Sequence, residues 1–232
     1  MFYVSIIRLF LYVISYKNNH IHIINMNIVA QPSNPEASAV FNERTGSAKL
    51  KKIITEPMSD ADIELYLPQA KVLMFRELKN YPNIQAILKR PRDYFVMLYE
   101  HTPQNGHWVA VLRYGNTIEF FCPYGTSPYS PNSCLEWNTP EQNAVVDATS
   151  NYLETMLNQA EKDGFKVIYN RMDLQNKDGN VNTCGAFVVF RVLCLMEDDM
   201  NLSEFQKGMK KIHAATGLNY DEIVADAIEI RE

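Results

Sequence analysis

The sequence predicts an α+β fold, and three features of the chain indicate it. Segments with a helical spacing of apolar residues lie toward both ends of the region 50–232, with short strand-like runs between them. Gly115-Asn116 separates two of those runs, as the turn of a β-hairpin would. Cys184–Met196 is apolar nearly all round, which is typical of a central buried helix. Because the order is helices, strands, helix, strand, helices, the class is α+β.

Length and composition fit one globular domain behind a segment of different character. The chain has 232 residues, 47% hydrophobic and 21% charged, which suffices for one domain with a real core. We expect residues 50–232 to form this domain, and residues 1–49 to be an N-terminal segment that is flexible or not part of the fold. The apolar run 2–16 is too short to span a bilayer as a helix, and no positive charge precedes it as in a signal peptide. A weak membrane anchor is the alternative for this run, and no stable membrane association is expected.

Charge and cysteine usage narrow the function classes. The net charge of −5 does not favour an overall nucleic-acid-binding surface. The local cluster Lys207, Lys210 and Lys211 is more typical of a solvated face. The four cysteines lack metal-type spacing and are too sparse for a disulfide scaffold, so a reducing compartment and no metal or cofactor are expected. One of them, Cys134, lies in a Pro/Ser/Asn loop and has no evident role.

The elements before the hairpin follow from caps and periodicity. Ser59-Asp60-Ala61-Asp62 predicts a helix start, and Pro68 should end this short helix. Apolar residues at 72, 73, 75 and 78 predict a second helix over Lys71–Tyr81. Tyr94–Tyr99 is a buried strand by length and residue type.

The hairpin and the later elements are expected in regular succession. His107–Tyr114 and Thr117–Phe121 form the two hairpin strands. A helix begins at Thr139, carries an apolar stripe from Val145 to Ala160 and stops at Gly164. The remaining elements are a short strand and three helices: Phe165–Tyr169, Cys184–Met196, Ser203–Ala215 and Tyr220–Ile230.

Cys184 is a candidate nucleophile because of its place at the start of a helix. The unpaired N–H groups and the dipole of a helix N-terminus favour a thiolate. Thr183 or Asn182 can cap the helix, and Gly185 lets a substrate backbone approach closely. The alternative is that Cys184 is one more small core residue. Cys194, in the middle of the same helix, fits the core better.

His107 and Gln175 complete a candidate catalytic set. His107 stands at the mouth of a strand, between Gly106 and Trp108, where a base could reach a thiol. Alone, a histidine at a strand end is more often a surface polar residue. Gln175 follows a short strand, and its amide N–H could bind an oxyanion beside the Cys184 backbone N–H. Alone, a loop glutamine is usually polar filler.

Hairpin register identifies the neighbour of His107. If Gly115-Asn116 are the turn residues, His107 shares a face with residues 118, 120 and 122. Cys122 is then the diagonal neighbour of His107, while Glu119 points to the opposite face and is not the orienting acid. A one-residue slip in register would reverse this assignment.

These motifs resemble the adenain-like cysteine peptidases. Gly106-His107-Trp108, the segment from Phe120 to Gly125, Gln175 and Thr183-Cys184-Gly185 occur in the order and spacing of that family. It comprises the adenovirus maturation endopeptidase and relatives in large DNA viruses, virophages and Maverick/Polinton elements, and it shares its core with the SUMO-specific peptidases. The resemblance covers roughly residues 94–197. It implies a papain-like/adenain-like fold whose central mixed sheet packs on the helix that starts at the nucleophile.

The resemblance also implies roles. His107 would be the general base, Cys184 the nucleophile and Gln175 the oxyanion donor. The family has Asp, Glu or Asn where this chain has Cys122, so Cys122 is structurally equivalent to the third catalytic residue but is a weaker hydrogen-bond partner. The spacing from Gln175 to Cys184 is two or three residues longer than usual, and the turn-like 178–180 accounts for it.

Three functions follow from the residues and the resemblance. The leading hypothesis is a cysteine endopeptidase that processes viral capsid or scaffold precursors at Gly-rich sites during virion maturation, in the virion and the infected-cell cytoplasm. The alternatives are a ubiquitin- or SUMO-type deconjugating peptidase and a catalytically degenerate binding module, which Cys122 motivates. Whether DNA or a peptide activates the chain, as in some viral relatives, stays open.

Overall fold

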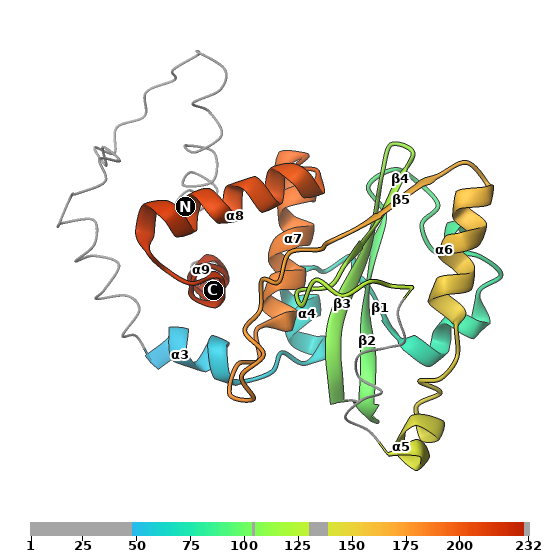
Figure 1. Cartoon of the computed structure of the whole chain (residues 1–232), viewed down its shortest axis with the longest axis horizontal. Coiled ribbons are helices and arrows are strands. Elements are labelled where there is room, and N and C mark those ends of the chain that lie inside the picture. Colours follow the sequence, from blue (N-terminus) through green and yellow to red (C-terminus); the bar gives the residue numbers. More distant parts are fainter. Residues whose placement is uncertain (1–47, 104, 130–138, 230–232) are drawn as a thin grey trace.

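The computed structural model describes residues 48–103, 105–129 and 139–229 (Figure 1). Nearly all of the predicted N-terminal segment lies outside these ranges, as does Cys134. In the described residues, no helix is both long and apolar enough to cross a membrane.

Five strands of the described chain form one mixed sheet in the order β1-β2-β3-β4-β5. The outer strands pair in parallel with their neighbours, and β2, β3 and β4 form an antiparallel meander. The strands are β1 Lys71–Met74, β2 Tyr94–Thr102, β3 Asn105–Tyr114, β4 Thr117–Phe121 and β5 Lys166–Tyr169. With the surrounding helices, this sheet confirms the predicted α+β class.

The hairpin forms in the predicted register. Tyr114 pairs with Thr117, and Gly115 adopts a φ of 54°, which a residue without a Cβ adopts readily. Arg113 then pairs with Ile118, and Ala110 pairs with Phe121. Side chains therefore alternate between the two faces along both strands, and the predicted division of His107 and Glu119 onto opposite faces depends on this pairing.

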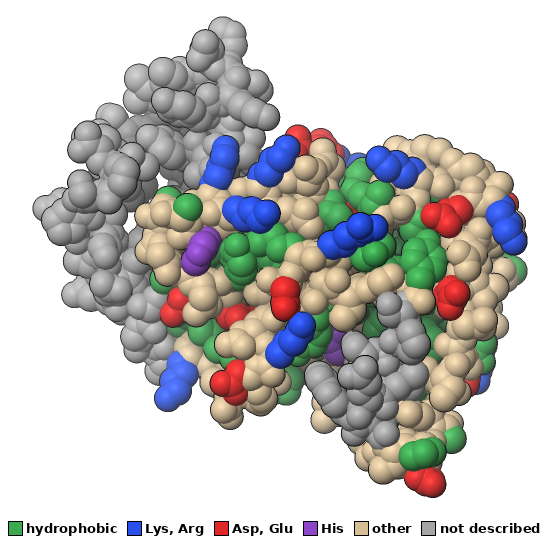
Figure 2. Space-filling view, in the orientation of Figure 1, with side chains coloured by type: hydrophobic (Ala, Val, Ile, Leu, Met, Phe, Trp, Pro, Cys, Tyr) green, Lys and Arg blue, Asp and Glu red, His purple; other side chains and the backbone are tan. Residues whose placement is uncertain are grey.

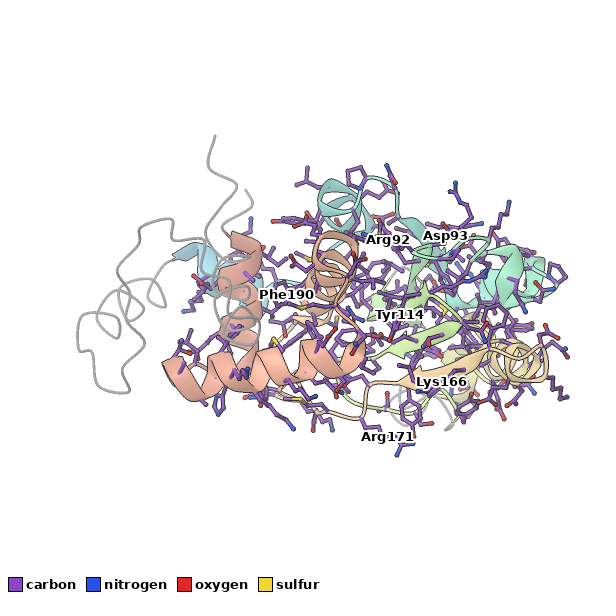
Figure 3. All side chains as sticks on the ribbon, turned by 90° about the horizontal axis from the view of Figure 1, so that it is seen from above. Arg92, Asp93, Tyr114, Lys166, Arg171 and Phe190 are labelled. Atoms are coloured by element: carbon purple, nitrogen blue, oxygen red, sulfur yellow. The ribbon has the colours of Figure 1, made fainter. Side chains whose placement is uncertain are left out.

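Helices cover both faces of the sheet (Figure 1). On one face, α7 packs against β3, and α9 contacts both α7 and α8. On the other face, α6 covers an apolar cluster that includes Phe95, Val111 and Ile118. The view from above shows the strands between these layers (Figure 3). The helices are α3 Ala48–Thr55, α4 Asp60–Tyr66, α5 Pro140–Val145, α6 Tyr152–Lys162, α7 Cys184–Asp198, α8 Leu202–Thr216 and α9 Tyr220–Glu229.

The cap signals at Ser59 and Gly217 are confirmed. Ser59 accepts a hydrogen bond from the Asp62 N–H, and the Asp62 carboxylate accepts one from the Ser59 N–H, which is a capping box at the start of α4. Gly217 ends α8 with a φ of 75°. Lys207, Lys210 and Lys211 are exposed on α8. Figure 2 shows Lys and Arg side chains on the surface over this helix.

The predicted helix over Lys71–Tyr81 is wrong. Residues 71–74 are strand β1, and Phe75–Asn80 forms a short 3-10 helix, η1. Leu73 and Phe75 pack in the core on the α6 side, whereas Val72 and Met74 contact the core on the α7 side. This alternation has the period of a strand, and pairing with the buried β2 outweighs the local helical spacing.

The predicted continuous helix from Thr139 to Gly164 is two helices. Between α5 and α6 the chain turns at Asp147, whose φ is 56°. The Asp147 carboxylate accepts hydrogen bonds from the Ser150 hydroxyl at 2.6 Å and the Tyr152 hydroxyl at 2.7 Å. These bonds compensate for the interrupted helix, and Val145, counted in the apolar stripe, is 63% exposed.

Candidate active site

Cys184 is the first residue of α7, as predicted. It is buried, in the same core cluster as Trp108. Burial raises the pKa of the thiol to about 11, while nearby backbone N–H groups, that of Trp108 first, oppose the rise. The sulfur therefore lies among donors that would stabilise a thiolate once the proton is removed.

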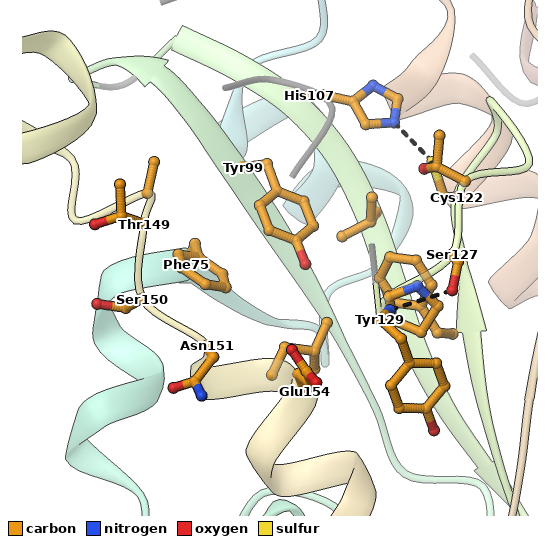
Figure 4. Close-up of a pocket in the computed structure, with 16 residues that line it drawn as sticks. Phe75, Tyr99, His107, Cys122, Ser127, Tyr129, Thr149, Ser150, Asn151 and Glu154 are labelled. Carbon is orange, nitrogen blue, oxygen red and sulfur yellow. Dashed lines mark hydrogen bonds between the residues drawn. The ribbon is translucent and has the colours of Figure 1, made fainter. Parts of the chain in front are cut away.

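His107 lies in β3, directly before Trp108, whose backbone N–H lies near the Cys184 sulfur. Its Nε2 is 3.3 Å from the Cys122 sulfur (Figure 4). The Tyr124 ring stacks on the imidazole, with centroids 4.4 Å apart and planes 19° apart. The ring of His107 is thus held at its edge by a sulfur and on one face by an aromatic side chain.

Cys122 follows β4 on the same face as His107, which confirms the register prediction. Its sulfur accepts a hydrogen bond from the Thr126 hydroxyl at 2.9 Å, and backbone N–H groups of Thr126 and Tyr124 also point to it. Burial raises the pKa of this thiol, so at neutral pH it is an uncharged partner of the histidine.

Glu119 lies on the opposite face, where it forms a buried ion pair. Its carboxylate accepts hydrogen bonds from Arg191 Nε at 2.8 Å and Arg191 Nη2 at 2.7 Å, and both side chains are fully buried. The Tyr114 hydroxyl donates a further hydrogen bond at 2.8 Å. Glu119 is thus committed to anchoring α7 on the sheet and does not orient His107.

Gln175 is buried beside the turn that follows β4. Its backbone N–H donates to the Pro123 carbonyl, and its side-chain Nε2 donates to the Val181 carbonyl at 3.3 Å. Its Oε1 has no hydrogen-bond partner among the described residues. The amide group is therefore only weakly held at its present position.

Trp108 and Gly185 form the floor around the candidate nucleophile, together with Met58. The Trp108 indole donates a hydrogen bond to the Met58 carbonyl at 2.8 Å. A Cβ on Gly185 would lie 2.7 Å from the Met58 Cβ, closer than side chains tolerate. The glycine after Cys184 is thus required by packing.

A cavity of about 300 Å³ opens on the α6 side of His107 and Cys122 (Figure 4). Phe75, Tyr99 and Leu153 contribute apolar walls, and Glu154 brings a carboxylate. The cavity therefore borders the edge of the imidazole that faces Cys122.

Tyr124, Thr126 and Asp221 also contact residues in or next to the site, although the sequence predicted no individual role for them. Tyr124 and Thr126 follow β4 closely, so the sequence alone indicated that they lie near Cys122. Asp221 lies 37 residues after Cys184 in the first turn of α9, and its sequence context indicates only a helix start. Its contacts with the site depend on how α9 packs, which local sequence does not reveal.

Comparison with known proteins gives one relative by sequence. No family model matches the chain. The chain is 27% identical to the uncharacterized protein V9 of Sputnik virophage over 169 residues, which are 72% of this chain and 91% of that protein. The chain is therefore similar to a virophage protein over most of the length of both.

Similar solved structures include two proteases. The ASFV pS273R protease has a TM-score of 0.39 at 14% identity, with coverage of 92% of this chain and 90% of that one. SUMO protease Ulp1 has a TM-score of 0.33 at 12% identity, with coverage of 84% and 96%. The central domain of the uncharacterized Lpg1148 protein from Legionella pneumophila has a TM-score of 0.35 at 20% identity, with coverage of 76% and 98%.

Proposed function

We propose that this protein is a cysteine endopeptidase with Cys184 as its nucleophile. The observation that carries the proposal is the position of Cys184 as the first residue of α7, in the same buried cluster as Trp108, which directly follows His107 in β3. The unpaired N–H groups at a helix start stabilise a thiolate nucleophile, whereas a structural core cysteine gains nothing from them.

In the proposed reaction, His107 takes the thiol proton as Cys184 attacks the scissile carbonyl. The C–N bond breaks, His107 returns the proton to the leaving amine, and water then hydrolyses the thioester. We assign the neutral imidazole the tautomer in which Nε2–H of His107 donates to the Cys122 sulfur, 3.3 Å away. This tautomer makes Nδ1 the basic nitrogen for Cys184.

Burial sets the resting state of the pair. Because burial raises the pKa of Cys184 to about 11, the uncoupled thiol is protonated at neutral pH. Proton transfer to His107 therefore accompanies attack. The Tyr124 ring face favours the resulting imidazolium through a cation–π interaction, which offsets the missing carboxylate at position 122.

The tetrahedral intermediate needs donors for its oxyanion. The Cys184 backbone N–H supplies one at the start of α7. The Gln175 amide supplies a second, since its contact with Val181 is long and uses only one of its two N–H groups.

The substrates that we propose are viral capsid or scaffold precursors with Gly-rich cleavage sites, processed in the virion and the infected-cell cytoplasm. The similarity to a virophage protein supports a viral origin. The resemblance of the motifs around His107 and Cys184 to the adenain-like peptidases supports Gly-rich cleavage sites.

Replacement of the nucleophile tests the proposal directly. Full-length wild type and Cys184→Ala are incubated with Gly-rich peptides from virophage capsid precursors, and products are measured by mass spectrometry. We expect cleavage by wild type only. Cys194→Ala is the matched control, a buried cysteine on the same helix, and it should cleave normally. Equal cleavage by Cys184→Ala would refute the assignment.

A catalytically degenerate binding module is the second candidate, because the neutral thiol of Cys122 replaces the usual polar partner of the histidine. Iodoacetamide alkylation at neutral pH, compared between wild type and His107→Ala, distinguishes the two candidates. If His107 is the base for Cys184, wild type is alkylated faster than His107→Ala, whereas an inert core thiol reacts equally slowly in both. Labelling by ubiquitin or SUMO vinyl sulfone would instead indicate a deconjugating peptidase.

A further inference from the structure

A single carboxylate, that of Asp221, joins two separate segments of the candidate site. Its Oδ2 accepts the Asn176 N–H at 3.0 Å, and its Oδ1 accepts the Thr183 hydroxyl. Asp221 is buried in the first turn of α9, a helix that otherwise packs on α3, α7 and α8. Its side chain therefore reaches from the last helix of the fold to both segments.

The two partners of Asp221 are sequence neighbours of the proposed catalytic groups. Asn176 directly follows Gln175, and Thr183 directly precedes Cys184. Residues 176–180, which lie between them, are exposed, so packing places little constraint on this loop. The carboxylate thus links both ends of this loop directly, in addition to the backbone bond that holds Gln175 to Pro123.

The contact also changes the start of α7. Thr183 is the N-cap residue, a position where the hydroxyl usually accepts a hydrogen bond from the first turn of the helix. In the described part of the chain, the Thr183 side chain makes no such cap and donates to Asp221 instead. The first-turn N–H groups of α7 are consequently left for the Cys184 sulfur and for an incoming oxyanion.

We propose that Asp221 is a positioning residue that holds Gln175 and Cys184 at the separation needed to bind the oxyanion. This role rests on the proposed peptidase function and deepens it. Asp221 does not contact the reacting atoms, and it acts through Asn176 and Thr183. A carboxylate suits the task because both of its partners are donors, and two acceptor oxygens on one rigid group fix their spacing.

The chain offers variants that separate positioning from stability. Asp221→Ala removes both hydrogen bonds. Asp221→Asn can keep both, because its oxygen accepts the Asn176 N–H while its amide donates to the Thr183 hydroxyl oxygen. Asp226, also buried on α9, provides Asp226→Ala as the matched control for loss of a carboxylate from this helix.

The test measures kcat and KM of the full chain on a fluorogenic peptide with Gly-Gly before an aminomethylcoumarin leaving group. Loss of one oxyanion donor typically costs about 10²–10³-fold in kcat. We expect Asp221→Ala to lower kcat by at least about 30-fold with KM changed less than about threefold. Asp221→Asn should recover kcat to within about fivefold of wild type, and Asp226→Ala should lower Tm with kcat unchanged.

The outcomes are decisive in each direction. Asp221→Ala with wild-type kcat, or Asp221→Asn as impaired as Asp221→Ala, would overturn the positioning role while the peptidase proposal stands. A wild-type chain that cleaves no peptide would overturn the peptidase proposal and this role with it. If Asp221→Ala does not fold, the near-isosteric Thr183→Val tests the same contact. It should lower kcat by about tenfold, and an unchanged kcat would overturn the role.

Discussion

The Glu119–Arg191 pair allows the separation of the two sheet faces to be tested quantitatively. Glu119→Gln keeps the size of the side chain but leaves the fully buried guanidinium of Arg191 without its counter-charge. The two hydrogen bonds that Arg191 donates, of 2.8 and 2.7 Å, lose the negative charge of their acceptor. The amide N–H of the substituted side chain would also point at the N–H groups of Arg191. Breaking a buried ion pair from one side typically costs about 3–5 kcal/mol.

For a chain of this size, about 3–5 kcal/mol corresponds to a fall in Tm of roughly 6–20 °C. Urea denaturation followed by circular dichroism measures the free energy of unfolding, and peptide cleavage at 15 °C measures kcat of the folded protein. We expect a large loss of stability and a nearly unchanged kcat, because Glu119 faces away from His107. Glu119→Gln/Arg191→Met should recover part of the lost stability, since the unpaired charge is removed.

The result that would refute this reasoning is a folded Glu119→Gln protein with wild-type stability and a kcat as low as that of His107→Ala. Such a protein would place the carboxylate behind the histidine. It would require the register of β3 and β4 to be shifted by one residue from the pairing of Tyr114 with Thr117.

Three further predictions concern the same strands. Cys122→Ala removes the sulfur 3.3 Å from His107 Nε2 and should lower kcat by about 10²-fold, whereas Cys122→Asp, which restores an acceptor, should retain more activity; equal rates would contradict a role for this side chain. Gly106→Ala would place a Cβ 1.9 Å from the Tyr99 carbonyl oxygen. It should therefore reduce the free energy of unfolding by about 1–3 kcal/mol or more. An unchanged midpoint of urea unfolding would show that the two strands do not approach so closely here. In His107→Ala, iodoacetamide alkylation of Cys184 should rise with pH until about pH 11, because burial raises the pKa of the thiol to about 11 and only the thiolate reacts; a plateau below pH 8 would show that the thiol is not held neutral by burial.

Features of the fold that depend on local chemistry were predictable from the sequence. The turn at Gly115-Asn116 determined the hairpin register, and the register placed Cys122 beside His107. Ser59 and Gly217 marked helix ends through caps that involve only neighbouring residues. Helix α7 is apolar nearly all round, which indicated its central position. Its first twelve residues are all buried: eleven are apolar or glycine, and the other is Arg191.

Features that depend on long-range pairing were not predictable in the same way. Four strand residues at 71–74 carry too short a pattern to distinguish periods of 2 and 3.6, and their pairing with β2 decides the outcome. The break at Asp147 depends on side-chain bonds to Ser150 and Tyr152, which compete with the helix. Asp221 is the extreme case, since its two partners lie 45 and 38 positions away in the sequence.

Strand β4 and the residue that follows it show how one register serves two purposes. Glu119 and Cys122 are three positions apart, so alternation places their side chains on opposite faces. The face toward α7 receives the carboxylate, where it neutralises Arg191 in a fully buried site. The face toward α6 receives the thiol, which meets His107 without introducing a second buried charge. A shift by one residue would leave Arg191 unpaired, at a cost of several kcal/mol, and would also remove the sulfur from the histidine. The interaction that stabilises the sheet against α7 therefore also fixes the partner of the proposed base, so selection for folding maintains the geometry that the chemistry requires.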